Sequence, residues 1–89
     1  MLFLLTNRTR KTLTPEQYGQ LGALAKQFYA SVPAGVTIRG EWAAVDQSRN
    51  YTLLEAPDIE TVERMQAPFA PYVEMEIVPV VAFSGWTAS

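Results

Sequence analysis

The spacing of hydrophobic residues changes several times along the chain, and each change predicts a new strand or helix. The apolar run MLFLLTNR at residues 1–8 is too short for a helix and predicts a largely buried strand. TPEQ then places Thr14 as an N-cap, Pro15 at the first helical position and Gln17 where its side chain can bond back to the cap. Apolar residues at spacings of three and four follow, and they predict a helix over residues 15–31.

Alternation of polar and apolar residues predicts a pair of strands in the middle of the chain. Residues 36–45, VTIRGEWAAV, and residues 51–55, YTLLE, both follow a period of two. The polar segment DQSRN separates them. Two such segments joined by a short polar turn are typical of an antiparallel hairpin.

The last part of the chain repeats the order of helix and then strand. Asp58 is a second N-cap, and the short apolar stripe behind it predicts a helix that Pro68 ends. Residues 72–80, YVEMEIVPV, alternate again and predict a fourth strand. The order βαββαβ predicts an α+β protein of the ferredoxin-like kind, in which two helices cover one face of a four-stranded antiparallel sheet.

The two faces of this predicted sheet differ in character. We assign the most apolar positions to the helix side: Phe3, Leu5, Val36, Ile38, Trp42, Val73, Met75 and Ile77. The other face then carries Leu2, Leu4, Thr6, Arg39, Glu41, Tyr51, Leu53, Glu55, Glu74, Glu76 and Val78. This mixture is too apolar for plain solvent and too charged for a dry core. It favours the pairing of two sheets around a cavity.

The composition also favours a dimer. The chain has 89 residues, of which 48% are hydrophobic and 18% are charged. One small domain buries only part of its surface, so this much apolar surface predicts a homodimer. We expect a single domain over residues 1–89, with residues 82–89, which contain Phe83 and Trp86, as an extension that packs on the partner.

Charge and terminal sequence exclude several classes of protein. The net charge is −2, and the scattered lysines and arginines form no basic stretch for nucleic acid or for an anionic membrane. The apolar start ends at Leu5, far short of a signal peptide or a membrane span. We therefore expect a cytoplasmic protein that binds neither nucleic acid nor membrane.

The residue types that are missing narrow the chemistry. The chain has no histidine and no cysteine, so it has no imidazole base, no thiolate and no usual zinc or haem ligand. Its glycines lack the spacing of a phosphate-binding loop. We expect no metal and no cofactor. Proton transfer is left to carboxylate, tyrosine or lysine.

Three segments, MLF at the start, NYTLLEAPDIETV in the middle and PFAPYVEMEIV near the end, resemble the muconolactone isomerase family. EW, RNYTLLE and EMEIVPVV are similar to a short uncharacterised bacterial domain family. Both belong to the dimeric α+β barrel superfamily, and the resemblance covers most of the chain. It implies a homodimer with its sheets face to face and a small-molecule pocket in each subunit. Relatives include isomerases and cofactor-independent monooxygenases, so the fold constrains the function weakly.

Two carboxylates are the catalytic candidates. Glu55 and Glu41 lie on neighbouring predicted strands and on the same assigned face. A partly apolar pocket can raise the pKa of such a group toward the working pH. Each has a structural alternative, because Glu55 can simply end its strand in solvent and Glu41 can pair with Arg39 or Arg49.

Four further residues are candidates for substrate binding: Asn7, Arg39, Trp42 and Tyr51. Asn7 can hydrogen-bond a ligand carbonyl or enolate, and Arg39 can meet an anionic substrate. Trp42 and Tyr51 are of a type more often found in a core or a dimer interface than in a substrate platform.

Two classes of function stay open on these residues. The first is a homodimer that binds a small, partly apolar carbonyl, lactone or phenolic compound. The second is a cofactor-independent isomerase or monooxygenase that uses a carboxylate as acid and base.

Overall fold

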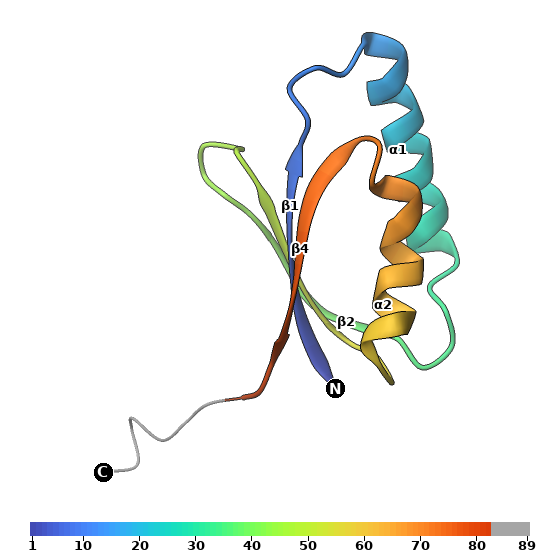
Figure 1. Ribbon diagram of the computed structural model, residues 1–89, viewed down its shortest axis with the longest axis vertical. Coiled ribbons are helices and arrows are strands. Elements are labelled where there is room, and N and C mark those ends of the chain that lie inside the picture. The colour runs from blue at the N-terminus through green and yellow to red at the C-terminus, as the bar shows by residue number, and fades with distance from the viewer. Residues whose placement is uncertain (83–89) are drawn as a thin grey trace.

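The structure, a computed structural model that describes residues 1–82, has the element order predicted from the sequence. The elements are β1 (Leu2–Thr9), α1 (Pro15–Ala30), β2 (Thr37–Ala43), β3 (Asn50–Glu55), α2 (Ile59–Gln66), the 3-10 turn η1 (Ala67–Phe69) and β4 (Val73–Val80). The strands form one antiparallel sheet in the order β2-β3-β1-β4. Both helices lie on one face of it (Figure 1). The ferredoxin-like βαββαβ fold is therefore confirmed.

Local capping signals place the start of both helices. The Gln17 amide donates to Thr14 Oγ1 at 3.2 Å, and the Thr14 amide donates to Gln17 Oε1 at 2.8 Å. At α2 the Thr61 amide donates to Asp58 Oδ1 at 2.8 Å. Side chains that satisfy the free amides of a first turn stabilise a helix, so these short motifs could be recognised in the sequence.

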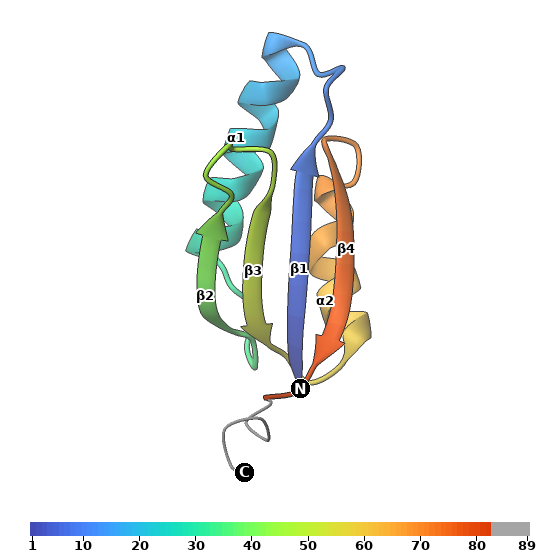
Figure 2. The ribbon, with the colours of Figure 1, turned by 90° about the vertical axis from the view of Figure 1, so that its left-hand side faces the viewer.

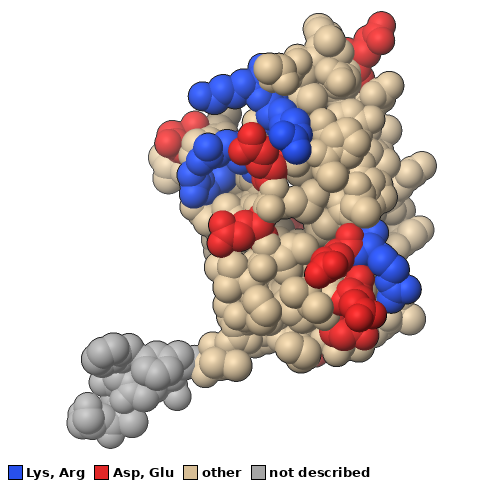
Figure 3. All heavy atoms as spheres, viewed as in Figure 1, with Lys and Arg blue, Asp and Glu red and all other residues tan. Residues whose placement is uncertain are grey.

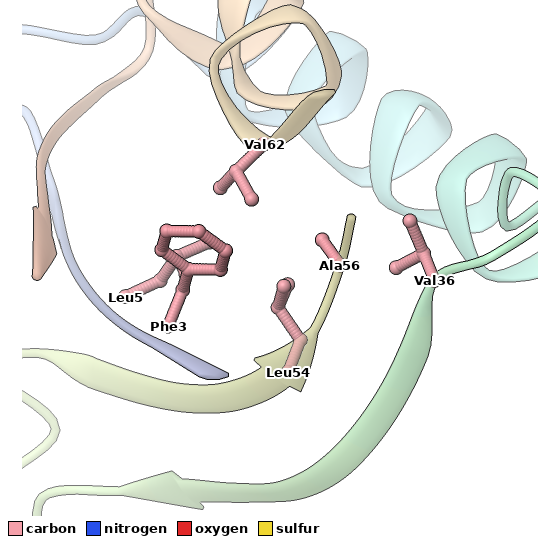
Figure 4. Packing of buried hydrophobic residues seen from close by; sticks show 6 residues of the cluster. All are labelled: Phe3, Leu5, Val36, Leu54, Ala56 and Val62. Carbon is pink, nitrogen blue, oxygen red and sulfur yellow. The ribbon is translucent and has the colours of Figure 1, made fainter. Parts of the chain in front are cut away.

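The apolar core lies between α2 and the N-terminal half of β1. Phe3 and Leu5 from β1, Leu54 from β3 and Val62 from α2 are almost completely buried. Ala56 and Val36 complete the cluster. Figure 4 shows the strand residues pointing toward Val62. The helix-side assignment for β1 is confirmed.

A bulge in β2 overturns two of the face assignments. Ile38 pairs with Leu54, but Gly40 pairs with Leu53, so Arg39 is one extra residue in the ladder. An extra residue moves every later side chain to the other face of the sheet. Trp42 therefore lies on the face away from the helices, where the residue is 57% exposed, and Glu41 lies on the helix side.

Gly40 is the sequence signal of this bulge. A Cβ built on Gly40 would lie 2.5 Å from Cη2 of Trp42, so the indole occupies the space above this glycine. A glycine inside a strand often marks a bulge or a close approach of this kind. The bulge was not recognised in the sequence, because the residues on either side of Arg39 both fit the apolar positions of a regular strand with a period of two.

We call the sheet surface that faces away from the helices the open face (Figure 2). Register places Leu4 of β1 between Leu53 of β3 and Val78 of β4, which makes an apolar row across its centre. The other members of the open face are Leu2, Thr6, Arg8, Trp42, Tyr51, Glu55, Glu74, Glu76 and Val80. The predicted extension at residues 82–89 lies outside the described residues apart from Ala82.

The charged side chains do not form a patch of one sign on the side of the molecule seen in Figure 3, where Lys and Arg lie beside Asp and Glu. The part of the chain that the structure describes contains no helix with the length and apolar character needed to cross a membrane.

Candidate functional site

A cavity of about 180 Å³ lies between the helices and the sheet, beside the apolar core. It forms where the helix-facing positions of the strands turn polar. Along β1 these positions change from Phe3 and Leu5 to Asn7. Along β3 they change from Leu54 to Thr52 and Asn50.

The way α1 packs agrees with this change. Within the described part of the chain, none of the residues of α1 is fully buried, whereas α2 buries Val62 and Gln66. Short polar side chains under α1 do not fill the space that large apolar side chains fill under α2. The cavity therefore follows from the polar residues that β1 and β3 direct at α1.

Asn7, which lines the cavity, has a buried side-chain oxygen without a hydrogen bond within the described part of the chain. Its side-chain oxygen Oδ1 is buried and has no hydrogen-bond partner among the described residues. Its neighbour across the ladder is Asn50, which also lines the cavity. A buried polar atom without a partner costs about 1–3 kcal/mol, so such atoms are uncommon.

The rest of the lining is polar but neutral on one side and apolar on the other. Gln66 of α2 is only 7% exposed and joins Asn7, Asn50 and Thr52 on the polar side. The apolar side consists of Leu21, Ala25, Phe28, Phe69 and Val73. The part of the lining that the structure describes contains no charged side chain.

Glu41 and Tyr29 form a bridge beside this cavity. The Tyr29 hydroxyl donates to Glu41 Oε2 at 2.8 Å, which joins α1 to β2. Both residues border an adjoining depression of about 360 Å³, which shares Asn7, Tyr29, Asn50 and Thr52 with the cavity. Glu41 therefore brings a carboxylate to the rim of the polar site.

Partial burial, followed by the bond to Glu41 and the negative charge of its carboxylate, raises the pKa of Tyr29 to about 12. The same group in an unfolded chain titrates at about 10. The neutral phenol therefore stabilises the fold fully below about pH 10, and this stabilisation is lost as the pH rises toward 12.

We expect Tyr29→Phe to remove part of the alkaline loss of stability. The residue is 54% exposed, so solvent screening limits the effect to about 1 kcal/mol or less. Urea unfolding at pH 9 and pH 11.5 measures it. Tyr18→Phe on the same helix is the matched control and should keep the wild-type fall. An equal fall in Tyr29→Phe would show that the bridge does not stabilise the fold.

The structure separates the two predicted catalytic carboxylates. Glu55 lies on the open face, where Arg39 Nη2 approaches both of its carboxylate oxygens at 3.2 Å. Glu41 lies on the helix side of the sheet. The expectation that they share a face was wrong, because the bulge at Arg39 lies between them in the ladder. Arg39 pairs with Glu55, and Glu41 bonds to Tyr29, so the suggested pairing of Glu41 with an arginine is not observed.

The predicted substrate-binding residues are also divided. Asn7 lies in the cavity. Trp42 and Tyr51 are partners across the ladder on the open face, and both also border the adjoining depression. Arg39 is engaged with Glu55 on the open face.

Four residues of the site were missed in the sequence: Tyr29, Asn50, Thr52 and Gln66. Asn50 and Thr52 did carry a signal, because they share the strand parity of the buried Leu54. Gln66 stands four residues after Val62, on the same side of α2. Tyr29 carried no comparable signal, because its partner Glu41 comes from a strand whose register the bulge shifts.

Comparison with known families assigns the chain. Residues 1–88 match a family described as Domain of unknown function (DUF3303). The chain belongs to this family. Comparison with curated proteins found no match.

Several solved structures have a similar fold, among them the following three. A muconolactone isomerase has a TM-score of 0.69 and 24% identity, with 100% of this chain and 97% of that chain covered. SCO4226 from Streptomyces coelicolor A3(2) has a TM-score of 0.51 and 23% identity, with 92% and 100% covered.

The third is a Dabb family protein from Mesorhizobium loti with a ferredoxin-like fold, with a TM-score of 0.53, 15% identity, and 93% and 98% covered. These are members of the dimeric α+β barrel group. At such identities the likeness establishes the fold and says nothing certain of activity.

Proposed function

We propose that this DUF3303 protein is a homodimer that binds a small, partly apolar carbonyl, lactone or phenolic compound in the cavity between its helices and its sheet. The unpaired Oδ1 of Asn7 is the observation that carries this proposal. Buried polar atoms almost always have a partner, and a bound ligand is one way to supply it.

The form of the cavity supports the same proposal. Binding sites for small molecules are concave, largely apolar, and carry a few placed polar groups. Here the apolar side is built by Leu21, Phe28 and Phe69, and the polar side by Asn7 and Gln66. An apolar cavity of about 150 Å³ in another protein is large enough to bind benzene. The cavity of about 180 Å³ therefore suits a compound of that order of size.

The open face supports the dimer. Leu4, Leu53 and Val78 form an apolar row that the helices do not cover. A large apolar surface on a small protein is typical of an interaction site, and a second copy can bury the same row on itself. We propose that the two sheets pack face to face and that residues 82–89 pack on the partner. We also propose that the protein is cytoplasmic. The ion pair of Arg39 and Glu55 then lies at the edge of this interface.

An enzyme is the second candidate, and the position of Glu41 favours it. Its carboxylate stands at the rim of the polar site and is held by Tyr29. In a ligand with a C=C bond one carbon removed from its carbonyl, Glu41 could take a proton from the carbon between them and return it to the far end of the C=C bond, which moves into conjugation with the carbonyl. An amide N–H of Asn50 or Asn7 would bond the enolate oxygen formed between the two transfers. Such an isomerisation balances without a cofactor. Glu55 stays a candidate from sequence, but its ion pair on the open face favours a structural role.

Titration of the protein with phenol, γ-butyrolactone and cyclohexanone, followed by two-dimensional NMR, tests the binding proposal. At least one should shift the side-chain amide signals of Asn7, Asn50 and Gln66 at millimolar concentration. Ala25→Leu fills the cavity and should abolish these shifts. Ala23→Leu, on the exposed side of the same helix, is the control and should keep them. Amide signals that no compound moves would contradict the proposal.

Incubation with cyclohexanone in D₂O separates the two candidates, because a carboxylate that removes and returns protons next to a carbonyl exchanges them for deuterium. If Glu41 acts as acid and base, the wild type should incorporate deuterium into the compound, and Glu41→Gln should retain binding and lose this exchange. If binding is the whole function, Glu41→Gln should leave the compound bound and chemically unchanged, as the wild type does.

A further inference from the structure

Four properties of the cavity together restrict the ligand further than the proposed function does. The first is size. Drug-sized pockets usually have about 300–1,000 Å³, whereas the cavity between α1, α2 and the sheet has about 180 Å³. This space suits one six-membered ring with a small substituent better than a fused pair of rings.

The second property is the direction of the missing hydrogen bond. The unpaired atom of Asn7 is the oxygen Oδ1, which can only accept. A ligand group that reaches this oxygen must therefore donate. A ketone, a lactone or an ether has no donor, whereas a hydroxyl group has one, and it can also accept from Thr52 or from the amide of Asn50 or Gln66.

The third property is charge. The described lining contains no cation that could bind an anionic ligand. The carboxylate of Glu41, at the rim of the site, carries a negative charge. A carboxylate ligand would lose its hydration without gaining a cationic partner. A phenol stays neutral at pH 7, because its hydroxyl titrates near 10 as that of tyrosine does.

The fourth property is the aromatic wall. The rings of Phe28 and Phe69 meet edge to face, with centroids 6.1 Å apart and an angle of 83° between planes. Both rings line the cavity. An aromatic ligand can extend this arrangement, since ring pairs at such separations add stabilisation beyond the area they bury.

We infer that the cavity selects a neutral, single-ring phenol, whose hydroxyl donates to Oδ1 of Asn7 and whose ring packs against Phe28 and Phe69. This inference rests on the proposed function, of which it names the ligand class. Asn7 then selects by hydrogen bonding, and the size of the cavity selects by shape.

Calorimetry and NMR titration at pH 7 with phenol, toluene, anisole, benzoate and 2-naphthol test the inference. Phenol should bind about tenfold more tightly than toluene or anisole, which is the effect expected for one hydrogen bond. Benzoate and 2-naphthol should not bind at the same concentrations. Equal affinity for phenol and toluene, or binding of 2-naphthol in the cavity, would overturn the inference.

Asn7→Leu keeps the size of the side chain and removes its polar atoms. It should reduce the affinity for phenol to that of toluene and leave the affinity for toluene unchanged or higher. Gln27→Leu, on the exposed side of α1, makes the same change from an amide to an apolar side chain away from the cavity and should keep the full preference for phenol. Asn50→Leu, at the ladder partner inside the cavity, tests whether that residue holds the hydroxyl instead. If only Asn50→Leu removes the preference, the hydroxyl is not held by Asn7 and the assignment is wrong.

The two proposals fail in different ways. If γ-butyrolactone or cyclohexanone binds in the cavity and phenol does not, the phenol inference is overturned while the proposed function stands. If none of these compounds shifts the amide signals of Asn7, Asn50 and Gln66, both are overturned.

Discussion

Replacing Phe3 with alanine should lower the free energy of unfolding by about 3–5 kcal/mol. Phe3 is 0% exposed and stands at the centre of the core, between its ladder partner Leu54 and Val62 of α2 (Figure 4). The substitution removes the transfer energy of a buried ring and leaves a cavity that neighbouring strands cannot close. Urea unfolding followed by circular dichroism at a fixed protein concentration measures the change.

Val45→Ala is the control for this prediction. Val45 is a fully exposed apolar residue in the turn after β2, so its truncation should change the unfolding energy by less than about 0.5 kcal/mol. A similar small change for Phe3→Ala would mean that the core is not centred on β1.

Leu53→Arg should separate the proposed dimer into monomers, with a rise in the dissociation constant of at least about 100-fold. Leu53 stands in the apolar row of the open face, next to Leu4. When two copies pack these rows together, a guanidinium at Leu53 loses water without gaining a partner, and the twofold axis brings the second guanidinium close to it. Sedimentation velocity at micromolar concentrations measures the loss.

Ala23→Arg on the exposed side of α1 is the matched control, since it adds the same charge away from the open face. It should leave the dimer intact, and both variants should keep the circular dichroism of the wild type. A wild-type protein that sediments as a monomer, or a Leu53→Arg variant that stays dimeric, would exclude the open face as the interface.

If the open face is covered in this way, the two regions of polar chemistry in the chain have different roles. The ion pair of Arg39 and Glu55 would then contribute to the edge of the proposed interface, whereas Asn7, Tyr29 and Glu41 belong to the proposed ligand site on the helix side. The bulge at Arg39 produces this division, because it sends Arg39 and Glu41 to opposite faces of one strand.

Element order could be predicted because the signals that define it are local. The capping residues Thr14 and Asp58 accept hydrogen bonds from backbone amides three residues away, so each motif can be recognised without knowledge of the rest of the fold. Hydrophobic periodicity is local in the same sense, and it distinguished strands from helices along the whole described chain. Once the order βαββαβ is known, few arrangements of the sheet satisfy the rules of chain connection.

The candidate site was predictable only in part. Asn7 could be identified as a polar residue at the end of an apolar strand. The partner of Glu41 could not be identified, because Tyr29 comes from a helix and the distance between them depends on how that helix packs. Asn50, Thr52 and Gln66 are ordinary polar residues until the ladder and the helices bring them around one cavity.

The secondary structure, the ferredoxin-like fold and the core positions of Phe3, Leu5 and Val36 followed from sequence patterns, because caps and periodicity act between residues close in the chain. The side of β2 that faces the helices became known only from the pairing of β2 with β3. Side chains alternate with a period of two, so the single extra residue at Arg39 reversed the faces of Glu41 and Trp42. The cavity could not be predicted from the sequence either, because its volume depends on how α1 packs on the polar positions of β1 and β3.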